Sequence, residues 1–180
     1  KGIEHFVDCV LEQSLRVAQK MEIPDLNFKL NLGVTSVDFY LKDLFVADFS
    51  INHTSMNFQA DEFVYCQVDK CDTEITLSWG FQQSSYPYMQ DHGTGKILIQ
   101  GMNVRASIAC MLNEVECPGH FLLQVKEADI SFRQLQVQLE GGTSWIYQSL
   151  VNIILKSLQS DLQNIFSAIL VTAIEDLVNM

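Results

Sequence analysis

The chain has 180 residues, a length typical of one domain, and its 48% hydrophobic and 18% charged residues exclude a disordered protein. Its 22 acidic and 11 basic residues give a net charge of −11. Because nucleic-acid binding needs clustered Lys and Arg, this composition argues against it. The most apolar run, IFSAILVTAI at 165–174, is too short to span a membrane, which takes about 18 residues.

The first predicted element is an amphipathic helix over residues 2–21. Apolar side chains recur at helical spacing from Ile3 to Met21, and charged side chains lie largely on the opposite face. The helix should end before Pro24, because the residue that precedes a proline avoids the helical conformation. The chain starts at Lys1, and a cleaved signal peptide would account for that start.

Strand patterns follow over residues 25–140. The segment LNFKLNL at 26–32 alternates apolar and polar side chains, as a half-buried strand does. Further runs cover residues 37–41, 45–57, 62–68, 74–81, 96–112, 121–125 and 130–139, with the turn signals HGTG and CPGH among the connections. The run at 96–112 is long for one strand and predicts a strongly curved sheet with a bulge near Gly101.

A long second helix is predicted over residues 143–178, directly after Gly141 and Gly142. It would be about 50 Å long at 1.5 Å per residue. It is apolar on nearly every side, so other elements must wrap it, and the long strands are the only ones able to do so. The sequence thus predicts a single α+β domain over 1–180, with an antiparallel sheet rolled around the C-terminal helix.

Four of the five cysteines form two short-range pairs. Cys66 with Cys71 and Cys110 with Cys117 each bracket a polar stretch, which predicts two hairpin disulfides. Unbridged thiols are one alternative, and a zinc site that includes His120 with the second pair is another. Cys9 is left over as a small buried residue.

Two further patterns bear on function. Asn52 opens the sequon Asn-His-Thr and is the candidate glycosylation site. No G-x-S-x-G or H-E-x-x-H motif occurs, and no catalytic or metal-binding residue is predicted. His5 and Cys9 share a helix face, but a core cysteine beside a rim histidine accounts for that pair.

Three motifs then occur in order: MEIPDL at 21–26, KILIQGMNVRASI at 96–108 and LEGGTSWIYQSLVN at 139–152. Together they resemble the BPI/LBP/CETP family, whose fold is the tubular lipid-binding (TULIP) barrel. The resemblance implies an elongated pocket between helices and sheet that holds phospholipid or another acyl-chain lipid, with no other cofactor. Residues expected to line that pocket are Phe6, Val10, Val17, Phe28, Leu30, Val104, Ile108, Leu150, Ile154 and Leu158.

The chain also departs from the family pattern. No cysteine occurs in 143–180, where the family's disulfide to the second helix would attach, and only one domain is present although many members have two in tandem. The tip loop GFQQSSYPYMQDHG at 80–93 has no Lys or Arg, which argues against recognition of lipopolysaccharide by charge. Phe81, Tyr86, Tyr88 and Met89 in this loop are candidate membrane contacts, because tyrosine is favoured at the lipid–water interface; an ordinary aromatic loop is the alternative.

Two functions therefore remain open from the sequence. The leading hypothesis is a secreted or secretory-lumen lipid-binding or lipid-transfer module, not an enzyme, that makes transient contact with membranes. The rival is a structural or protein-interaction domain, in a larger assembly or beside a second similar domain, whose barrel is filled by its own side chains.

Overall fold

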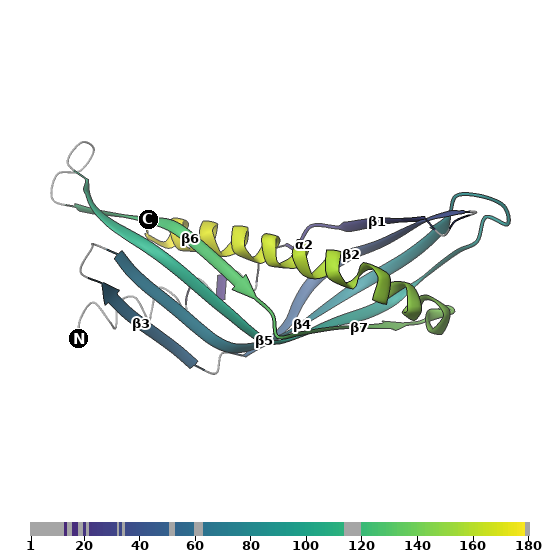
Figure 1. Ribbon diagram of the computed structural model, residues 1–180, viewed down its shortest axis with the longest axis horizontal. Helices are drawn as coiled ribbons and strands as arrows, with labels where there is room; N and C mark the ends of the chain where they lie inside the picture. Colours follow the sequence, from purple (N-terminus) through teal and green to yellow (C-terminus); the bar gives the residue numbers. More distant parts are fainter. Residues whose placement is uncertain are drawn as a thin grey trace.

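The computed structural model describes residues 13, 16–17, 20, 22–31, 33, 35–50, 53–59, 63–113 and 120–178. They form an elongated, curled antiparallel sheet with one long helix along its concave side (Figure 1). The α+β class and the rolled sheet are therefore confirmed. Nearly all of the predicted N-terminal helix, with Phe6 and Val10, lies outside the described residues.

The seven strands have lengths that differ by more than threefold, from 6 to 24 residues. Their bounds are β1 (Leu26–Asn31), β2 (Ser36–Ser50), β3 (His53–Gln59), β4 (Phe63–Gln83), β5 (Gln90–Asn113), β6 (His120–Ser131) and β7 (Gln134–Glu140).

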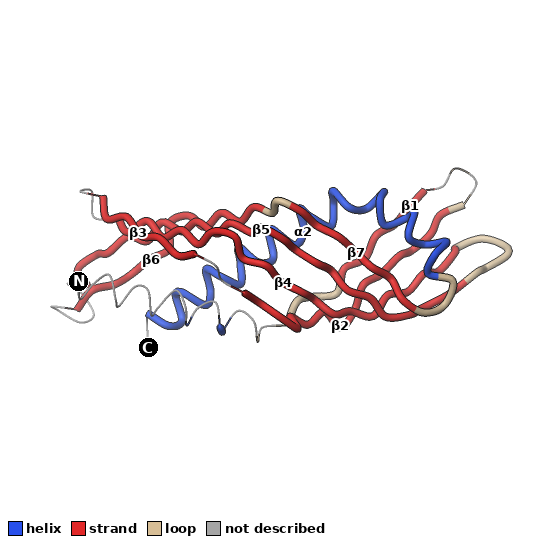
Figure 2. Tube along the Cα trace, turned by 90° about the horizontal axis from the view of Figure 1, so that it is seen from below, coloured by secondary structure: helices blue, strands red, loops and turns tan. Residues whose placement is uncertain are grey.

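The two longest strands, β4 and β5, run through both halves of the molecule (Figure 2). One half has the order β1-β2-β4-β5-β7, and the other has β3-β4-β5-β6. Each long strand thus changes its outer neighbour midway along its length, and the two halves share one continuous β4–β5 ladder.

Two bulges of opposite sense interrupt that ladder at its centre. Val68 pairs with Val104, Cys71 with Met102 and Thr73 with Ile99, so β4 has an extra residue on one side of the Cys71 pair and β5 has one on the other. Lys70 and Gly101 have positive φ angles at these points, 59° and 61°. Side chains alternate between the two faces of a sheet, so one extra residue in a single strand would turn its following side chains to the other face. Because each strand has one extra residue here, the side chains on both sides of the bulges keep facing the interior.

This arrangement corrects part of the sequence analysis. A bulge near Gly101 is confirmed, but residues 67–70 form no turn between two strands, because β4 continues through them. HGTG at 92–95 also lies within β5. Glycine is needed there because β7 and Trp79 approach closely: a Cβ on Gly93 would lie 2.2 Å from the Glu140 carbonyl oxygen.

The long helix α2 (Ser144–Val178) matches the predicted range and packs mainly on β6 and β7. Its buried residues recur every three or four positions and face the sheet: Tyr147, Val151, Ile154, Leu158, Leu162, Phe166, Leu170 and Ala173. The opposite side is exposed, including Asn152, Ile153 and Lys156. The expectation that the helix is enclosed on all sides is therefore wrong, since the described sheet covers one face.

Candidate functional site: the apolar interior and the uncharged tip

The interior of the curl is built by alternation along the strands. In β7 the sequence QLQVQLE turns Leu135, Val137 and Leu139 inward and leaves its polar residues exposed. The α2 side chain Gln148 accepts from the Leu139 amide at 3.4 Å and donates to the Val137 carbonyl oxygen at 2.8 Å. Among the described strands, β7 pairs only with β5, so these bonds occupy backbone groups on its other side and hold α2 against the apolar face.

At one end of the interior, four aromatic rings join the sheet to the helix. The Trp79 ring centroid lies 6.3 Å from that of Phe39 and 5.3 Å from that of Tyr147, and Phe81 lies 4.5 Å from Tyr147. The indole N–H of Trp79 donates to the Glu140 carbonyl oxygen at 3.0 Å. We call Phe39, Trp79, Phe81 and Tyr147 the aromatic cluster; all four are buried, so side chains fill this end of the interior.

Midway along β4, the inward face carries two groups with hydrogen-bonding capacity, Cys71 and Thr73. Cys71 is fully buried and free, and burial, followed by the nearby carboxylates of Asp72 and Asp69, raises the pKa of its thiol to about 11. The predicted Cys66–Cys71 disulfide is therefore wrong. Both residues lie on one extended strand, about 16 Å apart at ~3.3 Å per residue, whereas a disulfide needs Cα atoms about 4.4–6.8 Å apart.

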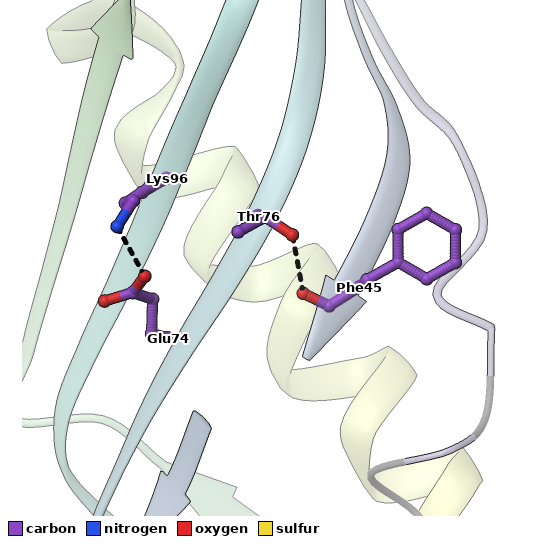
Figure 3. A network of polar contacts seen from close by, with 4 residues as sticks. All are labelled: Phe45, Glu74, Thr76 and Lys96. Carbon is purple, nitrogen blue, oxygen red and sulfur yellow. Dashed lines mark hydrogen bonds and ion pairs between the residues drawn. The ribbon is translucent and has the colours of Figure 1, made fainter. Parts of the chain in front are cut away.

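The outer face of the sheet at the same level is polar. Lys96 forms an ion pair with Glu74 at 2.7 Å, and the Thr76 hydroxyl donates to the Phe45 carbonyl oxygen at 3.5 Å (Figure 3). The pKa of Lys96 is raised by its hydrogen bond to Glu74 and by that carboxylate's charge. A depression of about 170 Å³ nearby is lined by the outward-facing residues Asp48, Ser50, Asp72, Glu74, Leu98 and Gln100, and it reaches Thr73 and Ile99 of the inward face at its floor. Its acidic surface is unsuited to acyl chains.

The described tip beyond the aromatic cluster consists of the β4–β5 turn, residues 84–89, together with Gly33 and Thr35 between β1 and β2. The two loops are joined by hydrogen bonds: the Ser84 amide donates to the Ser36 carbonyl oxygen at 3.0 Å, and the Thr35 and Ser85 hydroxyls pair at 2.6 Å. A depression of about 360 Å³ between them has an uncharged polar lining of Asn31, Gly33, Thr35, Ser36, Ser84 and Ser85.

Three large side chains project from this tip. Tyr86, Tyr88 and Met89 leave 85%, 69% and 46% of their surfaces exposed. The two tyrosine rings meet edge to face at 6.4 Å, and the Tyr88 amide donates to the Ser85 carbonyl oxygen at 2.9 Å. The turn therefore presents both rings together on one exposed surface. Phe81, which we expected beside them, is buried against Tyr147, so its assignment as a membrane contact is wrong.

At the base of the tip, Asp91 holds the start of α2. Its Oδ2 accepts from the Thr143 amide at 2.8 Å and from the Thr143 hydroxyl at 2.6 Å. These bonds, with a further one from the His92 amide, lower the pKa of the Asp91 carboxyl. A Cβ on Gly142 would lie 2.4 Å from Asp91 Oδ1, so glycine at that position lets the carboxylate reach the helix start.

Comparison with known proteins identifies this architecture. The model of the LBP/BPI/CETP family, N-terminal domain, matches residues 8–180. The chain belongs to the LBP/BPI/CETP family. It is 22% identical over 165 residues to a BPI/LBP family protein of Arabidopsis thaliana and 19% identical over 180 residues to the human BPI fold-containing family C protein. These alignments cover 90% and 98% of this chain but only 31% and 34% of the relatives' lengths.

Solved structures agree on the fold. The crystal structure of lipopolysaccharide binding protein superposes with a TM-score of 0.76 at 14% identity, over 99% of this LBP/BPI/CETP chain and 38% of that one. Takeout 1 of Epiphyas postvittana has a TM-score of 0.50 at 11% identity, over 94% of this chain and 88% of its own. Both support a tubular lipid-binding fold.

The residues expected to line the pocket of this LBP/BPI/CETP domain differ in how far they are buried. Phe28, Val104, Ile108, Ile154 and Leu158 are buried in the interior, and Leu30 and Leu150 are half-buried beside it. Val17 is 37% exposed. The glycosylation candidate Asn52 and the side chains of Cys66, Cys110 and Cys117 lie outside the described part, so the second disulfide stays a prediction.

Two observations concern what the described residues lack. They include no group of three or more His, Cys, Asp or Glu side chains placed to hold a metal ion. Within the same residues, no helix has the length and apolar character needed to cross a membrane. The sequence analysis missed Thr73 and the aromatic cluster. Alternation over 71–81 would have placed Thr73, Trp79 and Phe81 inward had β4 been recognised as one strand, whereas Phe39 and Tyr147 join the cluster from β2 and α2.

Proposed function

We propose that this chain is a non-enzymatic, secreted lipid carrier domain that holds an acyl-chain lipid along α2 and exchanges it with membranes through the uncharged tip. The observation that carries the proposal is the interior: the inward side chains of the strands and of α2 form one buried, mainly apolar cluster within the fold of the LBP/BPI/CETP family. Burial of an acyl chain there gains about 0.8 kcal/mol per methylene, which favours retention of long chains.

The tip supports contact with zwitterionic membranes. Residues 82–90 and 31–36 contain no charged side chain, and Tyr86, Tyr88 and Met89 are exposed among them. With a net charge of −11, the chain would be repelled by anionic head groups within a Debye length of about 8 Å. Aromatic side chains at the lipid interface provide an attraction that does not depend on charge.

Lipopolysaccharide is a less suitable ligand. One structural neighbour is a lipopolysaccharide binding protein, but the corresponding tip here offers no Lys or Arg for phosphate groups. Since the relatives are about three times longer, the ligand and transfer activity of any longer protein that contains this domain are likewise part of the proposal.

A second candidate function has one observation in its favour. The aromatic cluster fills the tip end of the interior with the chain's own side chains, as a purely structural or protein-interaction domain would require. Such a protein would not release or take up lipid.

Two measurements test the carrier function. Organic extraction of the purified protein followed by mass spectrometry should yield a long-chain lipid, and the emptied protein should take up a fluorescent phosphatidylcholine. If it neither contains nor takes up lipid, the filled-barrel function is the correct one.

Membrane docking has its own test. Replacement of Tyr86 and Tyr88 by Ser should slow transfer of the fluorescent lipid between phosphatidylcholine vesicles, while bound lipid and Tm stay unchanged. Phe45→Ser is the matched control, because Phe45 is 56% exposed on β2, outside the tip. Equal rates for the tyrosine variant and wild type, or a steep fall in the wild-type rate with added salt, would exclude the tip as the docking surface.

A further inference from the structure

The interior contains one polar atom whose bonding is incomplete. Thr73 is 4% exposed, and its Oγ1 is buried with no hydrogen-bond partner. By cross-strand register its neighbours on the inward face are Phe49 on β2 and Ile99 on β5, and along β4 they are Cys71 and Ile75. The hydroxyl therefore lies at mid-length of the sheet, on the face that belongs to the proposed lipid site.

An unpartnered hydroxyl in such a place needs a physical reason. Buried side-chain polar atoms are hydrogen-bonded in the large majority of cases, and an unbonded one lowers stability. Valine has the same shape, favours strands and would avoid this cost. A threonine that gains a partner only when a ligand enters would compensate for the cost in the bound state.

The surroundings restrict the chemistry of that partner. The buried polar or charged residues among the described ones are Thr73 and Ser107, so no described Lys or Arg is buried with Thr73. The Cys71 thiol beside it is protonated at neutral pH, since its pKa is raised to about 11. A carboxylate would be buried here without a counter-charge, which is strongly unfavourable, whereas a neutral carbonyl oxygen can accept from both the hydroxyl and the thiol.

The direction of the ligand is restricted as well. Thr73 lies ten residues from Gln83 at the tip end of β4, about 33 Å at ~3.3 Å per residue. The aromatic cluster, which includes Trp79 and Phe81 of the same strand, occupies the interior between them. An acyl chain anchored at Thr73 would thus extend into the half of the sheet formed by β3, β4, β5 and β6.

We propose that Thr73 and Cys71 form a subsite for the carbonyl oxygen of a neutral, ester-linked acyl lipid, with Thr73 as the principal donor. The subsite discriminates an ester from a hydrocarbon of equal length and from a free carboxylate. It rests on the proposed lipid-carrier function but makes a separate claim about which chemical group is recognised and where.

The test uses Thr73→Val, which keeps the shape and removes the hydroxyl, with Thr73→Ser as the matched control that keeps it. Binding of radiolabelled methyl palmitate, octadecane and palmitate to delipidated protein is measured by equilibrium partition. We expect wild type to bind methyl palmitate most tightly of the three ligands. Thr73→Val should lower the affinity for methyl palmitate by about three- to tenfold and leave the affinity for octadecane unchanged. Thr73→Ser should retain most of the preference for methyl palmitate. The ligand-free Thr73→Val protein should also melt at a higher temperature than wild type.

The outcomes separate the two claims. If wild type binds the lipids but Thr73→Val binds methyl palmitate equally well, the subsite is refuted and the carrier function stands. If wild type prefers palmitate to methyl palmitate, the neutral-carbonyl assignment is refuted. If wild type binds none of the three, both claims fail. Should Thr73→Val fold poorly, Thr73→Ala supports the same comparison.

Discussion

Replacement of Trp79 by Phe should destabilise the domain by about 2–4 kcal/mol. Trp79 is 1% exposed and donates to the Glu140 carbonyl oxygen, so its loss leaves that acceptor without its indole partner, at a cost of about 1–3 kcal/mol. The smaller ring also gives up packing against Phe39 and Tyr147, which adds about 1 kcal/mol. A domain of this size has about 5–15 kcal/mol of stability, so Tm should fall by roughly 5–15 °C.

The assay is urea unfolding followed by far-ultraviolet circular dichroism, which does not depend on tryptophan emission. Tyr86→Phe is the control, because Tyr86 is 85% exposed and its change should stay within about 0.5 kcal/mol. A double-mutant cycle with Tyr147→Leu should return a coupling of about 0.5–1.5 kcal/mol between the two rings. A Trp79→Phe variant as stable as the control would refute the view that the aromatic cluster fastens α2 to the sheet.

Three further outcomes are expected. Asp91→Asn should weaken the start of α2 and lower Tm at neutral pH. Because the pKa of Asp91 is lowered in the folded state, its stabilising contribution is present above about pH 4 and is lost as the pH falls through the folded pKa. The Tm values of wild type and variant should therefore converge in acid, and a difference in Tm that stays constant with pH would contradict this assignment. Cys71 should resist alkylation in the folded protein at pH 8 and react in urea, as followed by mass spectrometry, and rapid labelling without denaturant would show that the thiol is accessible. Gly80→Ala should cost about 1–3 kcal/mol of stability, measured by thermal melting, because its Cβ would lie 2.0 Å from Cζ at the outer end of the half-exposed Tyr40 side chain, which must turn away. An unchanged Tm would show that the Tyr40 ring moves away without loss of packing.

The spacing of apolar residues was sufficient to predict an element where each of its faces stays either buried or exposed along the whole length. The apolar stripe of α2 predicted its range closely, because local pattern and tertiary burial agree there. The run predicted over residues 130–139 is divided between the end of β6 and β7, although the inward positions of β7 follow the alternation. The local pattern failed at Lys70 and Gly93, where polar and glycine residues typical of turns lie inside long strands. A bulge and a close strand approach are tertiary features, and single-sequence signals do not distinguish them from a chain reversal.

The residues of the candidate site likewise fall into those that local spacing predicts and those that depend on tertiary contacts. Buried positions such as Ile154 and Leu158 were predictable from helical spacing. Phe81 was misplaced because a loop was assumed from its neighbours, whereas its position depends on a ring 66 residues away, Tyr147. The orphan hydroxyl of Thr73 could be recognised only once its neighbours on three strands were known.

The paired bulges at the centre of the β4–β5 ladder restrict how the length of this chain can change over evolution. Deletion of Lys70 alone would invert the facing of one part of β4 relative to β5 and turn outward-facing carboxylates toward the apolar interior. Deletion of Lys70 together with Gly101 would restore the match and give a straighter ladder. Homologues should therefore gain or lose residues at these two positions jointly, although 30 residues lie between them in the sequence.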